Sequence, residues 1–142
     1  MIMGKFGKIY IYTDGGSRGN PGPGAIGILI LDEGKKILYR DAEYIGETTN
    51  NRAEYKALIE ALKKAKKYTK GEVNCFSDSK LMVKQLQGEF KIKSYFLKKL
   101  HQKVKELEKN FKRVNYNHVR REDRKIEIVD ELLNKALDEN EK

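Results

Sequence analysis

Near its amino terminus the chain reads YTDGGSRGNPGPG, from Tyr12 to Gly24. The alternating apolar run that starts at Lys8 predicts a strand ending on Asp14 and a glycine-rich turn. About thirty residues later the chain reads TTNNRAE (residues 48–54), which predicts a helix start with paired asparagines and a carboxylate, Glu54, in the first turn. Together the two stretches indicate a metal site that also contacts a sugar-phosphate backbone.

The length and composition predict one soluble domain. The chain has 142 residues, and we expect residues 1–142 to form a single domain with a core from about residue 8 to residue 137. The longest apolar run, Ala25 to Leu31, has seven residues, far fewer than the ~20 that cross a bilayer. Residues 1–7 lack the apolar segment of a secretory signal, and the one cysteine, Cys75, cannot form an internal disulfide. We therefore expect a cytoplasmic protein without a membrane partner, and a monomer because no oligomer signal is present.

Basic residues are concentrated in the second half of the chain. Lys and Arg number 30 against 21 Asp and Glu, a formal net charge of +9. Between Lys91 and Lys125 there are thirteen basic and four acidic residues. This clustering favours a nucleic-acid partner over a charged surface that serves only solubility or heat adaptation.

The hydrophobic pattern predicts an α/β fold. Strands are expected over residues 8–13, 25–31, 36–44, 72–77 and 113–119. Helices are expected from Asn50 or Asn51 to about 68, from Asp78-Ser79 to about 87, and over 94–110 and 126–137, with a charged loop at 120–125 and a frayed tail from 138. Short turns make the first three strands antiparallel, and helical connections make the later strands parallel to the first. The result is one mixed five-stranded sheet flanked by helices.

Four carboxylates are expected at one edge of this sheet. Ligands bind outside the carboxyl ends of parallel strands, where Asp14 and Asp78 end the first and fourth strands. Glu54 and Asp130 lie on helices whose first turns could face the same edge. Converging carboxylates raise each other's pKa unless a cation joins them, and oxygen ligands select Mg²⁺ or Mn²⁺. Each acid taken singly also fits a turn or a helix cap, but together they predict a metal-dependent enzyme acting on phosphate.

Four motifs carry a resemblance to type 1 ribonuclease H. They are Tyr12 to Gly24, Thr48 to Glu54, Ser77-Asp78-Ser79 and Val129 to Leu137, and the resemblance extends from Lys8 to Leu137. It implies a ribonuclease H-like fold and an endonuclease that cuts the RNA strand of an RNA–DNA hybrid, leaving 3′-hydroxyl and 5′-phosphate ends. In the family's scheme two ions ~4 Å apart clamp the scissile phosphate.

The same resemblance implies the roles of individual residues. The catalytic and metal-binding set is Asp14, Glu54, Asp78 and Asp130. The substrate-binding set, which would read the RNA 2′-hydroxyls, is Gly15, Asn20, Asn50, Asn51 and Ser79. Basic residues between 91 and 125 would hold the phosphates of the DNA strand.

The sequence departs from the family pattern in two places. The histidine of the family's mobile loop has one candidate, His118, on the fifth strand and twelve residues before Asp130, where a structural or surface role is favoured. The link between the fifth strand and the last helix therefore differs from the family pattern. Because of this difference, Asp123 is a rival to Asp130 for the position of the fourth acid. The tryptophan-bearing basic protrusion of some members is also absent, because residues 88–94 are short and the chain has no tryptophan. Hybrid binding should then be weaker or shift to the helix over 94–110.

Two other functions stay open from the sequence. One is a nuclease of the same fold that acts on DNA or duplex RNA, and the other is a catalytically silent hybrid-binding module. Four acids in the family's order argue against the silent module, because a site without a metal has no reason to keep four repelling charges together.

Overall fold

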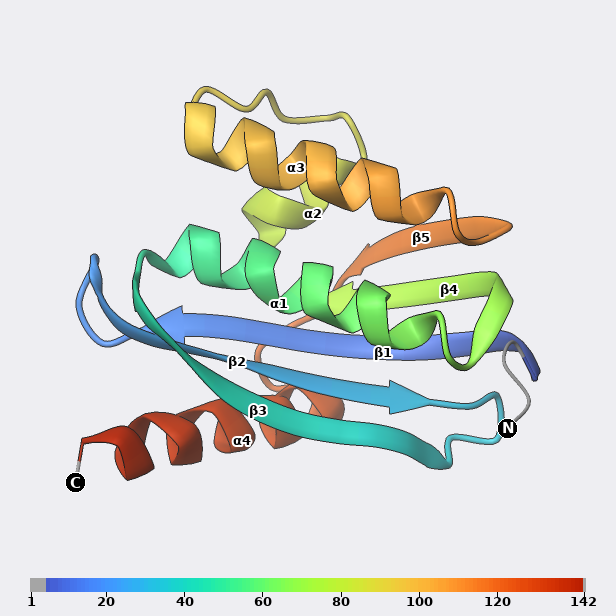
Figure 1. Ribbon diagram of the computed structural model, residues 1–142, viewed down its shortest axis with the longest axis horizontal. Coiled ribbons are helices and arrows are strands. Elements are labelled where there is room, and N and C mark those ends of the chain that lie inside the picture. Colours follow the sequence, from blue (N-terminus) through green and yellow to red (C-terminus); the bar gives the residue numbers. More distant parts are fainter. Residues whose placement is uncertain (1–4, 142) are drawn as a thin grey trace.

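The computed structural model describes residues 5–141 and confirms the predicted mixed five-stranded sheet. The sheet order is β3-β2-β1-β4-β5, with β1, β2 and β3 antiparallel and with β4 and β5 parallel to β1 (Figure 1). In chain order the elements are β1 (Phe6–Ser17), β2 (Gly22–Leu31), β3 (Ile37–Thr48), α1 (Asn50–Ala65), β4 (Thr69–Ser77), α2 (Lys80–Leu86), α3 (Tyr95–Glu108), β5 (Arg113–His118) and α4 (Arg124–Asn140). No helix within residues 5–141 is long and apolar enough to cross a membrane.

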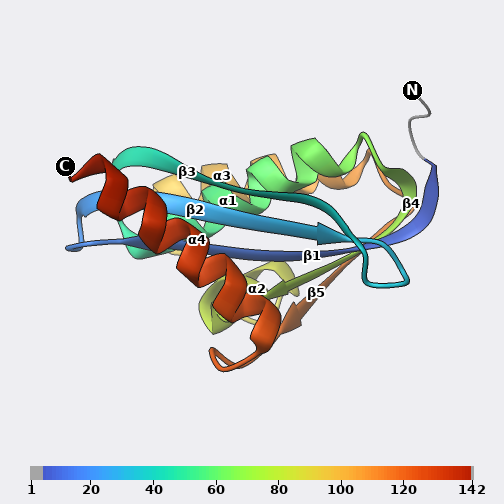
Figure 2. The same cartoon turned by 90° about the horizontal axis from the view of Figure 1, so that it is seen from below.

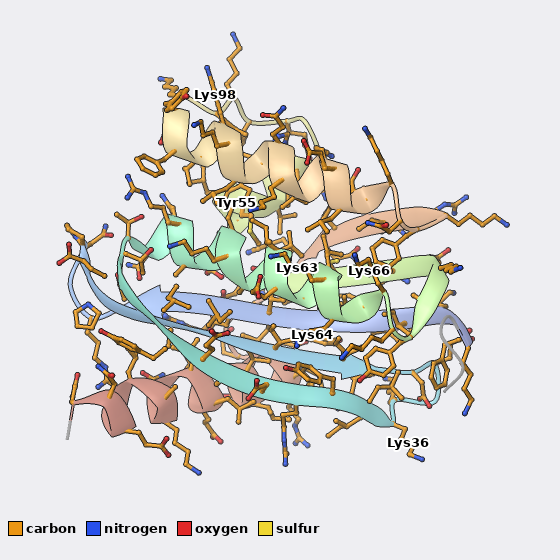
Figure 3. The ribbon with its side chains drawn as sticks, viewed as in Figure 1. Lys36, Tyr55, Lys63, Lys64, Lys66 and Lys98 are labelled. Carbon is orange, nitrogen blue, oxygen red and sulfur yellow. The ribbon has the colours of Figure 1, made fainter. Side chains whose placement is uncertain are left out.

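Helices cover the two faces of the sheet unequally. On one face α1 packs against β1 and β2, and α3 packs on α1, whereas α4 crosses the other face over β1, β2 and β3 (Figures 1 and 2). The larger core lies under α1, where the buried side chain of Tyr55 points toward α3 and donates a 2.7 Å hydrogen bond to Oε1 of Gln85 on α2 (Figure 3). A smaller core joins α4 to β2 through Val129, Leu29 and Leu31.

Strand β1 is longer than its apolar pattern predicts. Its parallel pairing with β4 ends at Tyr12 and Phe76, as expected for a strand that stops near Thr13. Its antiparallel pairing with β2 continues to Ser17, which lies opposite Gly24. Asp14 is therefore inside β1 and not at its end, although it lies just beyond the last residue paired with β4.

The sequence predicted Asn50 or Asn51 as the N-cap of helix α1, but the N-cap is Thr49. The Thr49 hydroxyl accepts a 3.2 Å hydrogen bond from the Arg52 amide, and the backbone of Thr49 is extended. This shift of one residue places Asn50 inside the first turn, where its side chain is free to bond β1. The helix ends at Ala65, three residues before the predicted Tyr68.

Helix α4 is longer than predicted at both ends. Asp123 caps it by accepting hydrogen bonds from the amides of Lys125 and Ile126, so the helix begins at Arg124, inside the segment predicted as a loop. At the other end the helix runs to Asn140 instead of fraying from Asp138. There Arg18 of the β1–β2 turn binds the carboxylates of Asp138 and Glu141, each at 2.8 Å.

Candidate active site

Three carboxylates from different elements converge at the sheet edge. Asp14 comes from β1 and Asp78 from the residue after β4. Glu54 lies in the second turn of α1 and not in the first turn, where the sequence predicted it, because the helix already begins at Asn50. One oxygen of each lies within 4.8 Å of the others, close enough for a single cation to contact all three. The sequence predicted this convergence from the position of each residue along its element.

Gly15 lets α1 approach β1 closely enough to deliver Glu54. Its amide donates a 3.0 Å hydrogen bond to Oε1 of Glu54. A Cβ atom on Gly15 would lie 2.3 Å from the carbonyl carbon and oxygen of Ala53, a distance that side chains do not tolerate. The glycine is therefore required by the contact between strand and helix, and its amide orients Glu54.

Asp130 lies beside Asp14. It projects from α4 into the same cavity, of about 970 Å³, that Asp14, Glu54 and Asp78 line. The charge of Asp130 raises the pKa of Asp14, and so does the hydrogen bond that protonated Asp14 donates to Asp130. Asp123, the rival for the fourth position, uses its carboxylate to cap α4.

Burial and mutual repulsion shift the pKa values of these acids upward. Burial raises the pKa of Asp14 to about 8, and the charges of Asp78 and Asp130 add to the shift. Burial, followed by the charge of Asp14, raises the pKa of Glu54 well above its ordinary value. The pKa of Asp78 is also raised by burial, against the opposing charge of Arg121. A cluster of carboxylates this close together is stabilised either by bound protons or by a bound cation, because both reduce the repulsion between the charges. All of its donor atoms are oxygens, which fits a hard divalent ion.

A polar network ties the glycine-rich turn to the start of α1. Oδ1 of Asn50 accepts a 2.8 Å hydrogen bond from the Ser17 amide, and Oδ1 of Asn20 accepts a 3.1 Å hydrogen bond from the Asn50 amide. Asn50 lines the cavity and Asn20 is exposed beside it. The two asparagines fix the width of the gap between the turn and the helix.

The other residues expected to bind substrate lie in different surroundings. Asn51 is exposed on α1, and its side chain makes no hydrogen bond among residues 5–141. Ser79 caps α2 by accepting a hydrogen bond from the Met82 amide. The Gly15 amide is used by Glu54, so a substrate atom would have to compete with that carboxylate.

The cavity also contains residues to which the sequence gave no site role or a different one. His118, for which a structural or surface role was favoured, lines the cavity at the end of β5. Arg121 lies 3.9 Å from Asp78, with a side chain that is 85% exposed. Arg18 and Asn134 close the far side, where Arg18 lies 3.3 Å from Oδ1 of Asn134. The signal for the Arg121 part of this wall was the basic run from Arg120 to Arg124, which the sequence interpretation counted among the residues that hold DNA-strand phosphates and did not connect with the acidic site.

The fold and the cavity define a class of protein. It is an α/β protein with a cluster of carboxylates that could bind a cation and with basic side chains around the same cavity. Comparison with known sequences narrows the class to a family. The family model described as RNase H matches residues 7–137. The chain belongs to the RNase H family.

Individual relatives agree over almost the whole chain. The chain is 39% identical over 132 residues to a bifunctional protein of Mycobacterium tuberculosis, covering 92% of this chain but only 36% of that protein. It is 37% identical over 133 residues to a ribonuclease HI of Halobacterium salinarum, covering 94% of this chain and 66% of that protein. The chain thus spans between about a third and two thirds of the length of these curated relatives.

Solved structures show the same agreement in three dimensions. LC11-RNase H1, solved in complex with an RNA/DNA hybrid, superposes with a TM-score of 0.88 at 42% identity, covering 94% of this chain and 99% of that one. The crystal structure of RNase H1 from Halobacterium salinarum gives the same TM-score at 37% identity, covering 94% of this chain and 99% of that one.

Proposed function

We propose that this chain hydrolyses the RNA strand of RNA–DNA hybrids, with Asp14, Glu54, Asp78 and Asp130 holding divalent cations, Mg²⁺ or Mn²⁺. The observation that carries the proposal is the convergence of three carboxylates within 4.8 Å, with a fourth beside Asp14. Family membership and the hybrid-bound relative supply the substrate class. The cytoplasmic location and the monomeric state stay predictions.

The chain's own residues divide the work of cleavage between them. A pair of hard divalent ions, when bound, would activate a water and stabilise the leaving 3′ oxygen. The Gly15 amide holds Oε1 of Glu54, so this carboxylate is already ordered before it would bind a cation. Arg121 and His118, which lie on the cavity wall near Asp78, are placed to attract the scissile phosphate.

An exposed aromatic patch supports a place for the second strand of the hybrid. Phe96 is 55% exposed at the start of α3, and the guanidinium of Arg52 lies over its ring at 3.9 Å. Tyr95, 69% exposed, has the ammonium of Lys99 over its ring at 4.8 Å. Exposed rings combined with cations bind sugar-phosphate backbones without reading sequence. We assign this patch to the DNA strand, where other members use a tryptophan-bearing protrusion.

The proposal is tested by digesting a labelled hybrid, duplex DNA and duplex RNA of one sequence, with and without Mg²⁺. Cleavage should require the metal and be confined to the RNA strand of the hybrid. Asp78→Asn should reduce the rate at least a hundredfold while hybrid binding is largely kept, because the cation loses a ligand and the binding surfaces are untouched. Asp41→Asn, on the exposed surface of β3, is the matched control and should retain full activity.

Three results would contradict this assignment. Cutting of duplex DNA alone would indicate another nuclease of the same fold. Hybrid binding with no cleavage in any metal would indicate the silent module. Full activity in Asp78→Asn would remove the metal assignment itself.

A further inference from the structure

The sheet has one face that α4 covers only in part. The helix packs against β1, β2 and β3, and Figure 2 shows β4 and β5 extending beyond it. We call the uncovered part the open sheet face. It is defined by three rows of side chains from β1, β4 and β5, which are Tyr12, Phe76 and Asn117, then Tyr10, Asn74 and Asn115, then Lys8, Glu72 and Arg113.

Aromatic rings form the row nearest the acidic cluster. Tyr12 and Phe76 stack with ring centroids 4.6 Å apart and an interplanar angle of 13°, and Tyr10 lies 6.2 Å from Phe76. The two tyrosines pack on Val129 of α4 and its neighbours, so they are supported from one side. Phe76 lies toward β5, opposite Asn117, and all three rings stay partly exposed. A flat and partly exposed aromatic ring is thus presented one row from Asp14 and Asp78.

Asparagine amides lie beside the rings and are held in fixed positions. Nδ2 of Asn115 donates to Oδ1 of Asn74 at 2.9 Å, and Nδ2 of Asn117 donates to the Cys75 carbonyl at 3.2 Å. These bonds leave the carbonyl oxygens of Asn115 and Asn117 without a donor among residues 5–141. The three asparagines border a surface hollow of about 540 Å³ that continues past the edge strand β5 to Gln87 and Lys105.

The outer row of the open sheet face carries an excess of positive charge. Lys8 and Arg113 lie 3.6 Å and 3.9 Å from the single carboxylate of Glu72, and the side chain of Arg113 is 69% exposed. One cation of the pair is therefore available to an anion. From the acidic cluster outward, the open sheet face thus carries aromatic rings, then asparagine amides, then cationic side chains.

We propose that the open sheet face binds an unpaired nucleic-acid strand that continues from the hybrid beside the cleavage site, an inference that rests on the proposed function. An unpaired base can stack on Phe76 and offer its edge to Asn115 and Asn117, whereas a paired base can do neither. Arg113 then meets the backbone phosphate. A protein partner fits less well, because the large exposed apolar side chains of residues 5–141 lie elsewhere, at Ile37, Tyr44, Leu81, Phe90, Tyr95 and Phe96.

The experiment compares a blunt hybrid with hybrids that carry six unpaired nucleotides at one of their four ends, as RNA or as DNA. Binding is measured by fluorescence anisotropy without divalent ions, so that nothing is cut. One of the four ends should increase affinity about tenfold, since each stacked base adds substantially to binding. Phe76→Leu and Asn117→Ala should remove most of this gain and Arg113→Ala part of it. Arg40→Ala, on the opposite edge strand β3, should leave the gain intact.

Cleavage of the blunt hybrid, measured on every protein, separates this inference from the proposed function. Blunt-hybrid cleavage with no gain from any extension would overturn the inference alone. A gain that survives in Phe76→Leu and Asn117→Ala would also overturn it, because the strand would then lie elsewhere. A partial loss of the gain in Arg113→Ala, with blunt-hybrid cleavage retained, supports the inference even if Phe76→Leu fails to fold, and an undiminished gain in Arg113→Ala contradicts it.

Discussion

Gly15 is the single residue on which the geometry of the acidic group depends most directly. Gly15→Ala would place a methyl group 2.3 Å from the Ala53 carbonyl, so α1 must move away and carry Glu54 with it. We expect a loss of about 1–3 kcal/mol in the free energy of unfolding, the usual effect of overpacking, and a large loss of hybrid cleavage. Thermal unfolding and cleavage assays check both effects. Gly7→Ala is the control, because nothing lies within 4 Å of its added Cβ, and equal behaviour of the two variants would contradict the close-packing argument.

Asp14 makes the stability of the metal-free protein depend on pH. Its pKa rises from 3.8 to about 8 in the folded chain, mainly through burial, so the folded state holds a proton that the unfolded state has lost between these values. The contribution to stability is complete below 3.8 and is lost as pH rises through about 8. We expect the thermal midpoint without metal to fall from pH 5 to pH 9. In Asp14→Asn the fall should be smaller, with a midpoint at pH 8 about 5 °C above that of the parent.

Two measurements decide whether this pH effect belongs to the acidic group. Added Mg²⁺ should raise the midpoint of the parent at pH 8 and have less effect on Asp14→Asn, because a cation relieves the same repulsion. Asp41→Asn should follow the parent at every pH. A parent midpoint that rises from pH 5 to pH 9 would show that Asp14 is not held in its protonated form.

Residues whose role follows from their position on one element were predictable. Asp14 and Asp78 could be placed because each lies where β1 leaves β4 or where β4 ends, and parallel strands bring these points together. The hydrogen bond between Asn50 and Ser17 could not be predicted, because it spans 33 residues of sequence. The same holds for Arg121, whose approach to Asp78 depends on how the loop folds after β5.

At the scale of elements, local propensity placed the helices and strands, and pairing set their ends. Strand β1 extends four residues past Thr13 because β2 supplies hydrogen-bond partners as far as Gly24. Helix α4 keeps its last turn because Arg18 reaches it across the molecule, a contact between residues more than a hundred positions apart. Neither partner is visible in a window of a dozen residues, which is why both boundaries were predicted short.

The contact of Arg18 with α4 can be tested in the whole protein by measuring how well the end of α4 is protected. Arg18 bonds Asp138, Glu141 and Asn134, and the two carboxylates, which carry the charge, are exposed. Arg18→Ala should therefore reduce hydrogen-exchange protection in residues 134–141 by about twofold at low salt and hardly at all at 1 M salt. Arg40→Ala is the control. Unchanged protection at low salt would show that α4 holds its end without the arginine.

At the scale of the whole molecule, the topology was predictable and the coverage of the sheet was not. Short turns and helical crossovers determine which strands run parallel, and the structure has that arrangement. Which face each helix covers depends on packing between distant apolar stripes. The partly uncovered face over β4 and β5, and with it the open sheet face, therefore had no sequence signal.

The distribution of charge over the whole molecule predicts which lysines contribute to hybrid affinity. Lys98 projects from α3 at the end of the molecule where α1 begins, whereas Lys36 and Lys66 lie toward the opposite end (Figure 3). Phe96 of the aromatic patch is on the same helix, two residues before Lys98. If the DNA strand follows the aromatic patch, Lys98→Gln should lower hybrid affinity and reduce the slope of log affinity against log salt by about 1, the effect of one lost phosphate contact. Lys36→Gln and Lys66→Gln remove the same charge from the net +9 and should leave the slope unchanged. Equal effects of all three substitutions would mean that net charge alone drives binding, and the aromatic patch would lose its assigned strand.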